Sequence, residues 1–196
     1  MRAQGKQLIL VMLIASALIA AVAQNSSTQA ASLDLLAKAN SGDAASQVQV
    51  GDNCAAGSGQ ARNSKQLAED YKQAAEWYRK AAEKGDIGGE LRLAALYRDG
   101  RGVARDMAQA ADWYRKAAEQ GDAGAQATLG VLYSMGQGVP HDDVEAYYWL
   151  DLAAAVKGPN QEKYAANRQM IGTHITADEL ADVEERVAKW QAAHPR

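Results

Sequence analysis

The chain has 196 residues, of which 21 are Lys or Arg and 24 are Asp or Glu, so its formal net charge at pH 7 is −3. This mildly acidic balance argues against nucleic acid and anionic lipid as partners. The length suffices for one domain with a substantial core, and the single cysteine excludes an intramolecular disulfide.

The first 23 residues have the pattern of a secretory signal peptide. Arg2 and Lys6 precede an apolar run over residues 8–23, which ends in the small-residue sequence Ala-Val-Ala. The run is shorter than the roughly 20 residues that cross a bilayer, and no cysteine follows it as a site of lipid attachment. We therefore expect cleavage near Ala23 and a mature periplasmic or secreted protein without a membrane span. A permanent membrane anchor is the alternative.

Three copies of one sequence motif occupy the middle of the chain. Their tryptophans, Trp77, Trp113 and Trp149, are 36 residues apart, and a fixed period of this length is typical of stacked helical repeats. Each unit is expected to hold two antiparallel helices, helix A and helix B, joined by a turn with two glycines. In the second unit these helices cover residues 86–99 and 106–120, and in the third they cover 122–135 and a segment from 142.

The start of helix B is specified locally in every unit. Asp70, Asp106 and Asp142 each stand three residues before Gln or Glu, the pattern of a capping box in which side chains bind free backbone amides. Gly85 and Gly121 stand where a left-handed residue is expected to end the helix. Helix B is therefore predicted to have defined ends.

One face of helix B is apolar. In the second unit this face consists of Ala110, Trp113, Tyr114, Ala117 and Ala118. We expect the Trp-Tyr pairs to fill the core between helices, and the alternative is a stacking platform for cell-wall sugars. The basic pairs, such as Arg115 and Lys116, are expected to form exposed ion pairs within their helix.

The first unit is atypical. Residues 37–59 align with 116–138, and an insertion at 58–68, rich in Gly, Ser and Asn, is typical of a solvated loop. Cys54 stands at the position of Tyr97 and Tyr133 in the later units. It is expected to be a small buried hydrophobic residue, and pairing between two chains is the alternative.

Residues 159–196 follow the repeats and are expected to form capping helices and a tail. Pro159 ends the third helix B, and a helix is predicted from about 162 to 170. A second helix follows Thr176, which forms a capping box with Glu179. We expect this last helix to cover the open end of the stack, since terminal repeats need a polar outer surface. Its apolar face consists of Leu180, Val183, Val187 and Trp190.

The motif D-x-x-x-A-x-x-W-Y-x-K-A-A-E-x-G-D, followed by A-x-A-Q-x-x-L-G-x-x-Y-x-x-G-x-G-V, resembles the Sel1-like repeat, a relative of the tetratricopeptide repeat. The resemblance covers residues 33–158 in about three units. It implies an all-α solenoid of antiparallel helix pairs whose concave side is lined by helix A. An ordinary solvated face, or a groove occupied by the C-terminal helix, is the alternative. The groove residues that the resemblance implies are Leu91, Ala95, Arg98, Asp99, Ala127, Val131, Ser134 and Met135.

The resemblance favours a scaffold or adaptor that binds a peptide or helix of a cell-envelope protein in this groove. We expect no catalytic residue, metal or cofactor. His141, His174 and His194 do not have metal-binding spacing, and no nucleophile or phosphate-binding motif is present. Carboxylate pairs such as Asp142 and Asp143 stand at helix starts, where the helix dipole favours them. The alternative is an envelope hydrolase or a glycan- or β-lactam-binding protein, although secreted relatives with reported β-lactam activity carry paired cysteines that this chain lacks.

Overall fold

The computed structural model describes residues 29–57 and 63–195. Both ranges consist of helices, turns and loops, with no strand in either. Residues 1–23, the predicted signal peptide, and residues 58–62 of the predicted insertion lie outside the described ranges. Among the described helices, none combines the length and the apolar composition that a membrane crossing requires.

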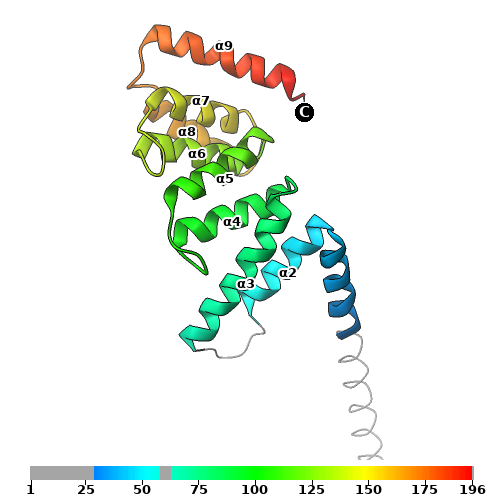
Figure 1. Ribbon diagram of the computed structural model, residues 1–196. Helices are drawn as coiled ribbons and strands as arrows, with labels where there is room; N and C mark the ends of the chain where they lie inside the picture. Colours follow the sequence, from blue (N-terminus) through cyan, green and yellow to red (C-terminus); the bar gives the residue numbers. More distant parts are fainter. Residues whose placement is uncertain (1–28, 58–62, 196) are drawn as a thin grey trace, which may run out of the picture.

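The helices form an elongated stack in which each packs mainly on its neighbours in the chain (Figure 1). Residues 29–41 are helical and lie at one end, and the last helix lies at the other. The prediction of an all-α solenoid of antiparallel helix pairs is confirmed. The labelled helices are α2 (Ala44–Ala56), α3 (Ser64–Ala82), α4 (Ile87–Asp99), α5 (Met107–Glu119), α6 (Ala123–Met135), α7 (Asp143–Ala154), α8 (Gln161–Ile171) and α9 (Ala177–Ala193).

The hairpin turns confirm the role of the paired glycines. Gly100 ends α4 and Gly136 ends α6 in the left-handed conformation, with φ of 69° and 62°. Gly138 has φ of 73°, and a Cβ built on it would lie 2.1 Å from the Met107 carbonyl oxygen. The turn of the third unit therefore packs on the first turn of α5 at a distance that only glycine permits.

The aspartates predicted to cap helix B do so in two units and not in the first. The predicted capping box is only half formed: the aspartate accepts its hydrogen bonds, while Glu145 pairs with Arg186 instead of the cap backbone. The side chain of Asp106 accepts hydrogen bonds from the backbone amides of Ala108 and Gln109. The side chain of Asp142 accepts one from the backbone amide of Glu145. Asp70, in contrast, lies inside α3, which begins at Ser64 behind an Asn63 cap. The sequence SKQLAE at 64–69 has no Gly or Pro and consists largely of good helix formers, so part of the predicted loop extends the helix by more than a turn.

The core lies between helices A and B along the stack. Alanines occupy many of its contact positions and let neighbouring helices approach closely. The largest cluster joins α4, α5, α6, α7 and α9, and a second joins α3 and α4. Cys54 is partly buried and packs against the second cluster, so its predicted place in the core is met only in part.

The predicted burial of the tryptophans is correct only for Trp149. Tyr78 and Tyr114 are buried, whereas the preceding Trp77 and Trp113 are partly buried. The ammonium groups of Lys80 and Lys116 lie 4.0 and 3.7 Å from the centres of these two indoles, a cation–π geometry. The tyrosine of each pair is therefore the core residue, and the outer face of the tryptophan is covered by a lysine.

The basic pairs do more than form ion pairs within their helix. Arg115 does contact Asp112 at 2.9 Å, as predicted. It also donates to the hydroxyl of Tyr133 at 3.1 Å, and Arg79 donates to that of Tyr97 at 3.0 Å. Because both tyrosines belong to the next unit, these arginines connect consecutive repeats.

The last two helices pack on different sides of α7. α8 packs on α7, with Ile171 and Tyr164 against the cluster between α6 and α7. α9 lies across α7, with Val183 and Val187 buried in the largest cluster (Figure 1). The predicted capping box of Thr176 and Glu179 is complete, with both of its hydrogen bonds present.

Candidate functional site

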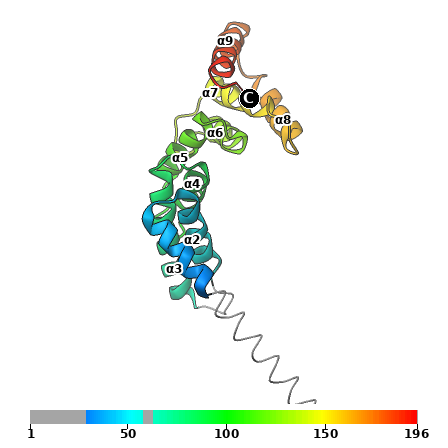
Figure 2. The same ribbon diagram turned by 90° about the vertical axis from the view of Figure 1, so that its right-hand side faces the viewer.

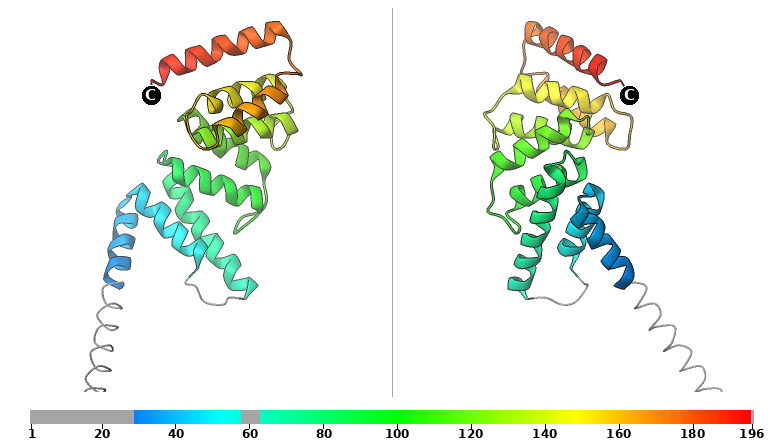
Figure 3. Two further views of the ribbon diagram at one scale, coloured as in Figure 1. Left: turned by 180° about the vertical axis from the view of Figure 1, so that it is seen from behind. Right: turned by 45° about the vertical axis from the view of Figure 1, so that its right-hand side comes forward.

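A hollow of about 310 Å³ lies between α6 and α8. In the left view of Figure 3, α8, drawn in orange, lies in front of the third unit, and α9 runs across the end of the stack above it. The lining residues of α8 stand 36 residues after those of α6, so they occupy equivalent places in consecutive A helices. These pairs are Gly124 and Asn160, Ala127 and Lys163, Thr128 and Tyr164, and Val131 and Asn167.

A second hollow, of about 700 Å³, adjoins the first. It lies between the end of α4, the turn that follows, the start of α5 and the open face of α6. Thr128 and Val131 line both hollows, so the two are neighbours on one face of α6, and we call them together the A-face groove. The remaining residues of the second hollow are Arg98, Asp99, Arg101, Arg105, Met107, Leu132 and Gln137.

Four of the eight groove residues expected from the sequence line the A-face groove: Arg98, Asp99, Ala127 and Val131. The other four lie elsewhere. Leu91 packs against the largest core cluster and Ala95 is partly buried, because helix A turns these positions toward its neighbours. The hydroxyl of Ser134 donates to the Val131 carbonyl of its own helix, and Met135 is 62% exposed at the end of α6.

The sequence-based prediction missed both flanks of the groove. Arg101 and Arg105 lie in the turn between α4 and α5, for which the glycine pattern predicts only a chain reversal. The α8 residues fall in a predicted capping helix, although the 36-residue register continues through them from α6. A count of charge along the turn, and extension of the period beyond 158, would have found them.

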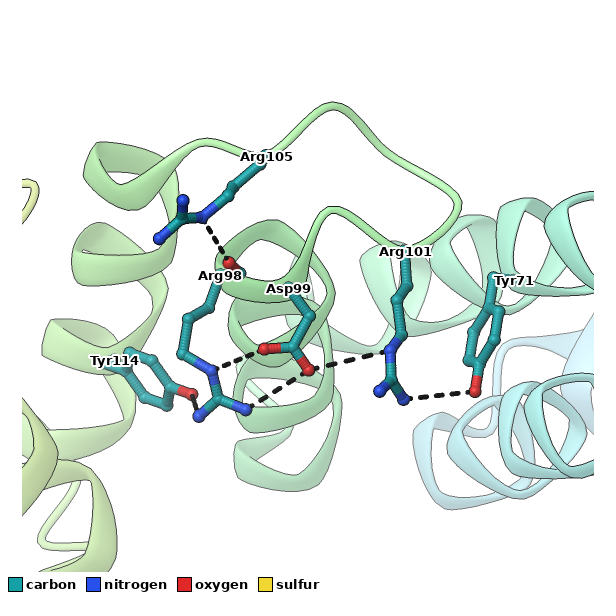
Figure 4. Close-up of polar contacts among 6 residues, drawn as sticks. All are labelled: Tyr71, Arg98, Asp99, Arg101, Arg105 and Tyr114. Carbon is teal, nitrogen blue, oxygen red and sulfur yellow. Dashed lines mark hydrogen bonds and ion pairs between the residues drawn. The ribbon is translucent and has the colours of Figure 1, made fainter.

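The basic flank of the groove is organised around Asp99 (Figure 4). Arg98 donates through Nε to the Asp99 carboxylate at 2.8 Å and through Nη1 to the hydroxyl of Tyr114 at 3.2 Å. Arg101 lies 3.9 Å from the other Asp99 oxygen and donates to the hydroxyl of Tyr71 at 3.3 Å. One carboxylate thus holds two guanidinium groups from the end of α4 and the turn.

The contacts within this cluster favour the charged forms of Arg98 and Asp99. The hydrogen bond from Arg98 lowers the pKa of Asp99, and the same contact raises the pKa of Arg98. Burial raises the pKa of the Tyr114 hydroxyl, which therefore remains a neutral partner of Arg98. Arg98 and Asp99 are thus both ionised near neutral pH.

The C-terminal helix does not lie in the A-face groove. Val183 and Val187 of α9 pack with Trp149 and Leu152, on the helix B side of the third unit. Arg186 of α9 adds an ion pair with Glu145 and stacks over the ring of Tyr148, 4.3 Å from its centre. Figure 2 shows α8 and α9 on different sides of the end of the stack.

Two of the histidines contact one carboxylate at the start of α7. His141 and His174 lie on either side of the Asp143 carboxylate, at 3.4 and 3.2 Å. The neighbouring Asp142 caps α7. Within residues 29–57 and 63–195, no group of three or more His, Cys, Asp or Glu side chains is placed to hold a metal ion.

Comparison with known proteins identifies the repeat. The family model for the Sel1 repeat matches residues 44–86, 89–122 and 123–155, which correspond to the pairs α2 with α3, α4 with α5, and α6 with α7. No curated protein sequence matches the chain.

Two solved structures have the same fold. One is a protective antigen present in uropathogenic Escherichia coli strains that displays an SLR fold; the TM-score is 0.57 at 29% identity, over 81% of this chain and 40% of that one. The chain therefore spans less than half the length of the antigen. The other is a Sel1 repeat protein from Oxalobacter formigenes, with a TM-score of 0.55 at 38% identity, over 62% of this chain and 87% of that one. Since the three matched repeats cover more than half of its length, the chain belongs to the Sel1 repeat family.

Proposed function

We propose that the mature protein is a periplasmic or secreted scaffold that binds a peptide or a helix of a cell-envelope protein in the A-face groove. The observation that carries this proposal is the groove itself. Equivalent positions of α6 and α8 line one of its two open hollows, and the lining of the groove combines apolar side chains with polar and charged ones. Grooves of this composition suit peptide recognition.

The family supports a binding role. Sel1 repeat proteins generally mediate protein–protein interactions and are typically scaffolds without enzymatic activity. The export pattern at the start of the sequence supports the compartment, and a cell-envelope partner follows from that compartment. We accordingly propose that the chain is not an enzyme.

The proposal is tested by selecting displayed random peptides on the mature protein and measuring their affinity for two variants. Thr128→Trp places an indole where the two hollows meet, because Thr128 lines both. Ala188→Trp makes a matched addition on the exposed face of α9. We expect selected peptides to lose more than about tenfold in affinity, or about 1.4 kcal/mol, with Thr128→Trp and to bind Ala188→Trp as they bind wild type.

Two results would contradict this assignment. Selection that enriches no peptide would remove the binding function itself. Peptides that bind both variants equally would place the binding surface elsewhere. Circular dichroism of each variant checks that a lost affinity is not a lost fold.

A further inference from the structure

The lining of the A-face groove has a charge opposite to that of the whole chain. Its charged residues are three arginines and one lysine against a single aspartate, Asp99. The chain as a whole has a net charge of −3. The cations therefore gather at this surface although the protein is acidic.

The arginines of the turn are not required by the turn. Arg101 and Arg105 stand 36 residues before Gln137 and His141, which occupy the same places in the third unit. The two turns nevertheless close with the same backbone hydrogen bond, from Asp106 to Tyr97 at 2.9 Å and from Asp142 to Tyr133 at 3.1 Å. Closure of the turn therefore does not need the two arginines. Arg101 connects Asp99 with Tyr71 of the preceding unit, whereas Arg105 forms no such ion pair within the described residues, and its charge is best explained by a ligand.

These guanidinium groups are accessible to a ligand. The side chains of Arg98 and Arg101 are 46% and 57% exposed. Arg105 donates through Nε to the Arg98 carbonyl at 3.1 Å, and its terminal nitrogens donate no hydrogen bond to any residue in the described ranges (Figure 4). Val131 of α6 and Met107 of α5 add partly buried apolar side chains to the lining of the same groove.

We infer that the A-face groove binds an acidic segment of its protein partner, with carboxylates on Arg101 and Arg105 and apolar side chains on Val131 and Met107. Guanidinium groups bind carboxylates through two parallel hydrogen bonds, which gives both energy and orientation. Lys163 on the opposite flank adds a cation for a second acidic residue. This inference rests on the proposed function and specifies the chemistry of the partner.

The test uses the peptides selected on the mature protein, each fluorescently labelled and measured by anisotropy. Arg105→Glu reverses a charge in the groove, and Lys38→Glu makes the same change at an exposed lysine of the helix over residues 29–41, at one end of the stack. We expect the selected peptides to be rich in Asp and Glu. Their affinity should fall more than about tenfold with Arg105→Glu, remain unchanged with Lys38→Glu, and fall as salt rises from about 50 to about 500 mM.

A charge exchange makes the test specific. Replacing each acidic residue of a selected peptide by Lys should abolish binding to wild type and restore part of it with Arg105→Glu. Peptides that depend on Thr128 but are neutral or basic, and bind Arg105→Glu as wild type, would overturn this inference while the proposed function stands. Selection of no groove-dependent peptide would overturn both.

Discussion

The second and third repeats contain the same tryptophan in two different surroundings. Trp113 is partly buried beneath the ammonium of Lys116, and Trp149, 36 residues later, is buried. The position of Lys116 is taken in the third repeat by Leu152, which is 0% exposed. The difference arises from α9, which packs on α7. In α5, a lysine covers the outer side of Trp113 instead.

This comparison separates what the repeat specifies from what its neighbours specify. The period fixes the place of each side chain along its helix and the face on which it stands. Whether that place meets water depends on what packs outside it. The position that is lysine in α5 (Lys116) is leucine in α7 (Leu152), because α9 covers this position only in the third repeat.

The largest effect on the free energy of unfolding is expected when Leu152 is given the residue of its equivalent, Lys116. Leu152→Lys places an ammonium in the buried cluster beneath α9 and should cost at least about 3 kcal/mol, since an unpaired buried charge is strongly destabilising. Lys116→Leu loses a cation–π contact, about 0.5–1 kcal/mol, and the attraction between its ammonium and the Glu90 carboxylate, so it should cost less than Leu152→Lys. Urea unfolding of both variants measures these costs, and equal values would contradict the assigned role of α9.

The tryptophans themselves give the next largest effect. Trp149→Ala removes a buried ring and should cost about 3–5 kcal/mol. Trp113→Ala removes a partly buried ring and should cost about half as much, roughly 1.5–2.5 kcal/mol. The reason is that folding removes less apolar area of this ring from water. Thermal unfolding of the pair decides: a larger loss for Trp113→Ala would mean that the central repeat, rather than the covered end, carries the core.

A third difference concerns one buried carboxylate. Gln47 and Gln126 are buried four residues after their capping aspartates, and each donates to a carbonyl eight residues earlier. Glu90 has the same place in the second repeat but is an acid, 2% exposed, that accepts a hydrogen bond from Gln120 at 2.8 Å. Burial raises the pKa of Glu90 above the ordinary value of 4.5.

Glu90→Gln should therefore stabilise the fold by about 1 kcal/mol at neutral pH, where it replaces a buried charge by the amide of the other repeats. Because the folded pKa is raised, the folded state binds the proton more tightly than the unfolded state. Wild type should thus gain stability relative to the variant as the pH falls through the folded pKa toward 4.5. Denaturation of both proteins across this range checks the sign, and a gap that widens at low pH would refute it.

The smallest expected effect concerns a contact between repeats. Arg115→Met removes the hydrogen bond to Tyr133 and the exposed ion pair with Asp112, and should cost about 0.5–1.5 kcal/mol. A double-mutant cycle with Tyr133→Phe isolates the contact between the two units. A coupling energy of zero would show that Arg115 acts only within its own helix.

Much of the fold could be predicted from the sequence, because caps and turns are local. Asp106, Asp142 and the paired glycines specify helix ends through contacts within a few residues. Asp70 has the same local pattern, yet the helix-forming residues before it override the cap. A capping aspartate therefore marks the start of a helix only where the residues before it do not themselves favour a helix.

The candidate site was harder to predict because a groove is made between elements. The register predicts Ala127 and Val131 for the groove, and both line it because their own helix presents them there. Leu91 and Ala95 have the same register, but packing around α4 withdraws them from the groove. Arg105 could not be placed from the pattern of its helix, because it lies in a turn whose path depends on the unit before it.

The central claim is that recognition takes place on the A-face groove and not on the side covered by α9. Amide chemical shifts of isotope-labelled mature protein, recorded with and without a selected peptide, test it most directly. The account predicts that the changes cluster at residues 98–107, 124–132 and 160–167, with none along the exposed face of α9. Changes confined to α9 and the outer faces of α5 and α7 would contradict it.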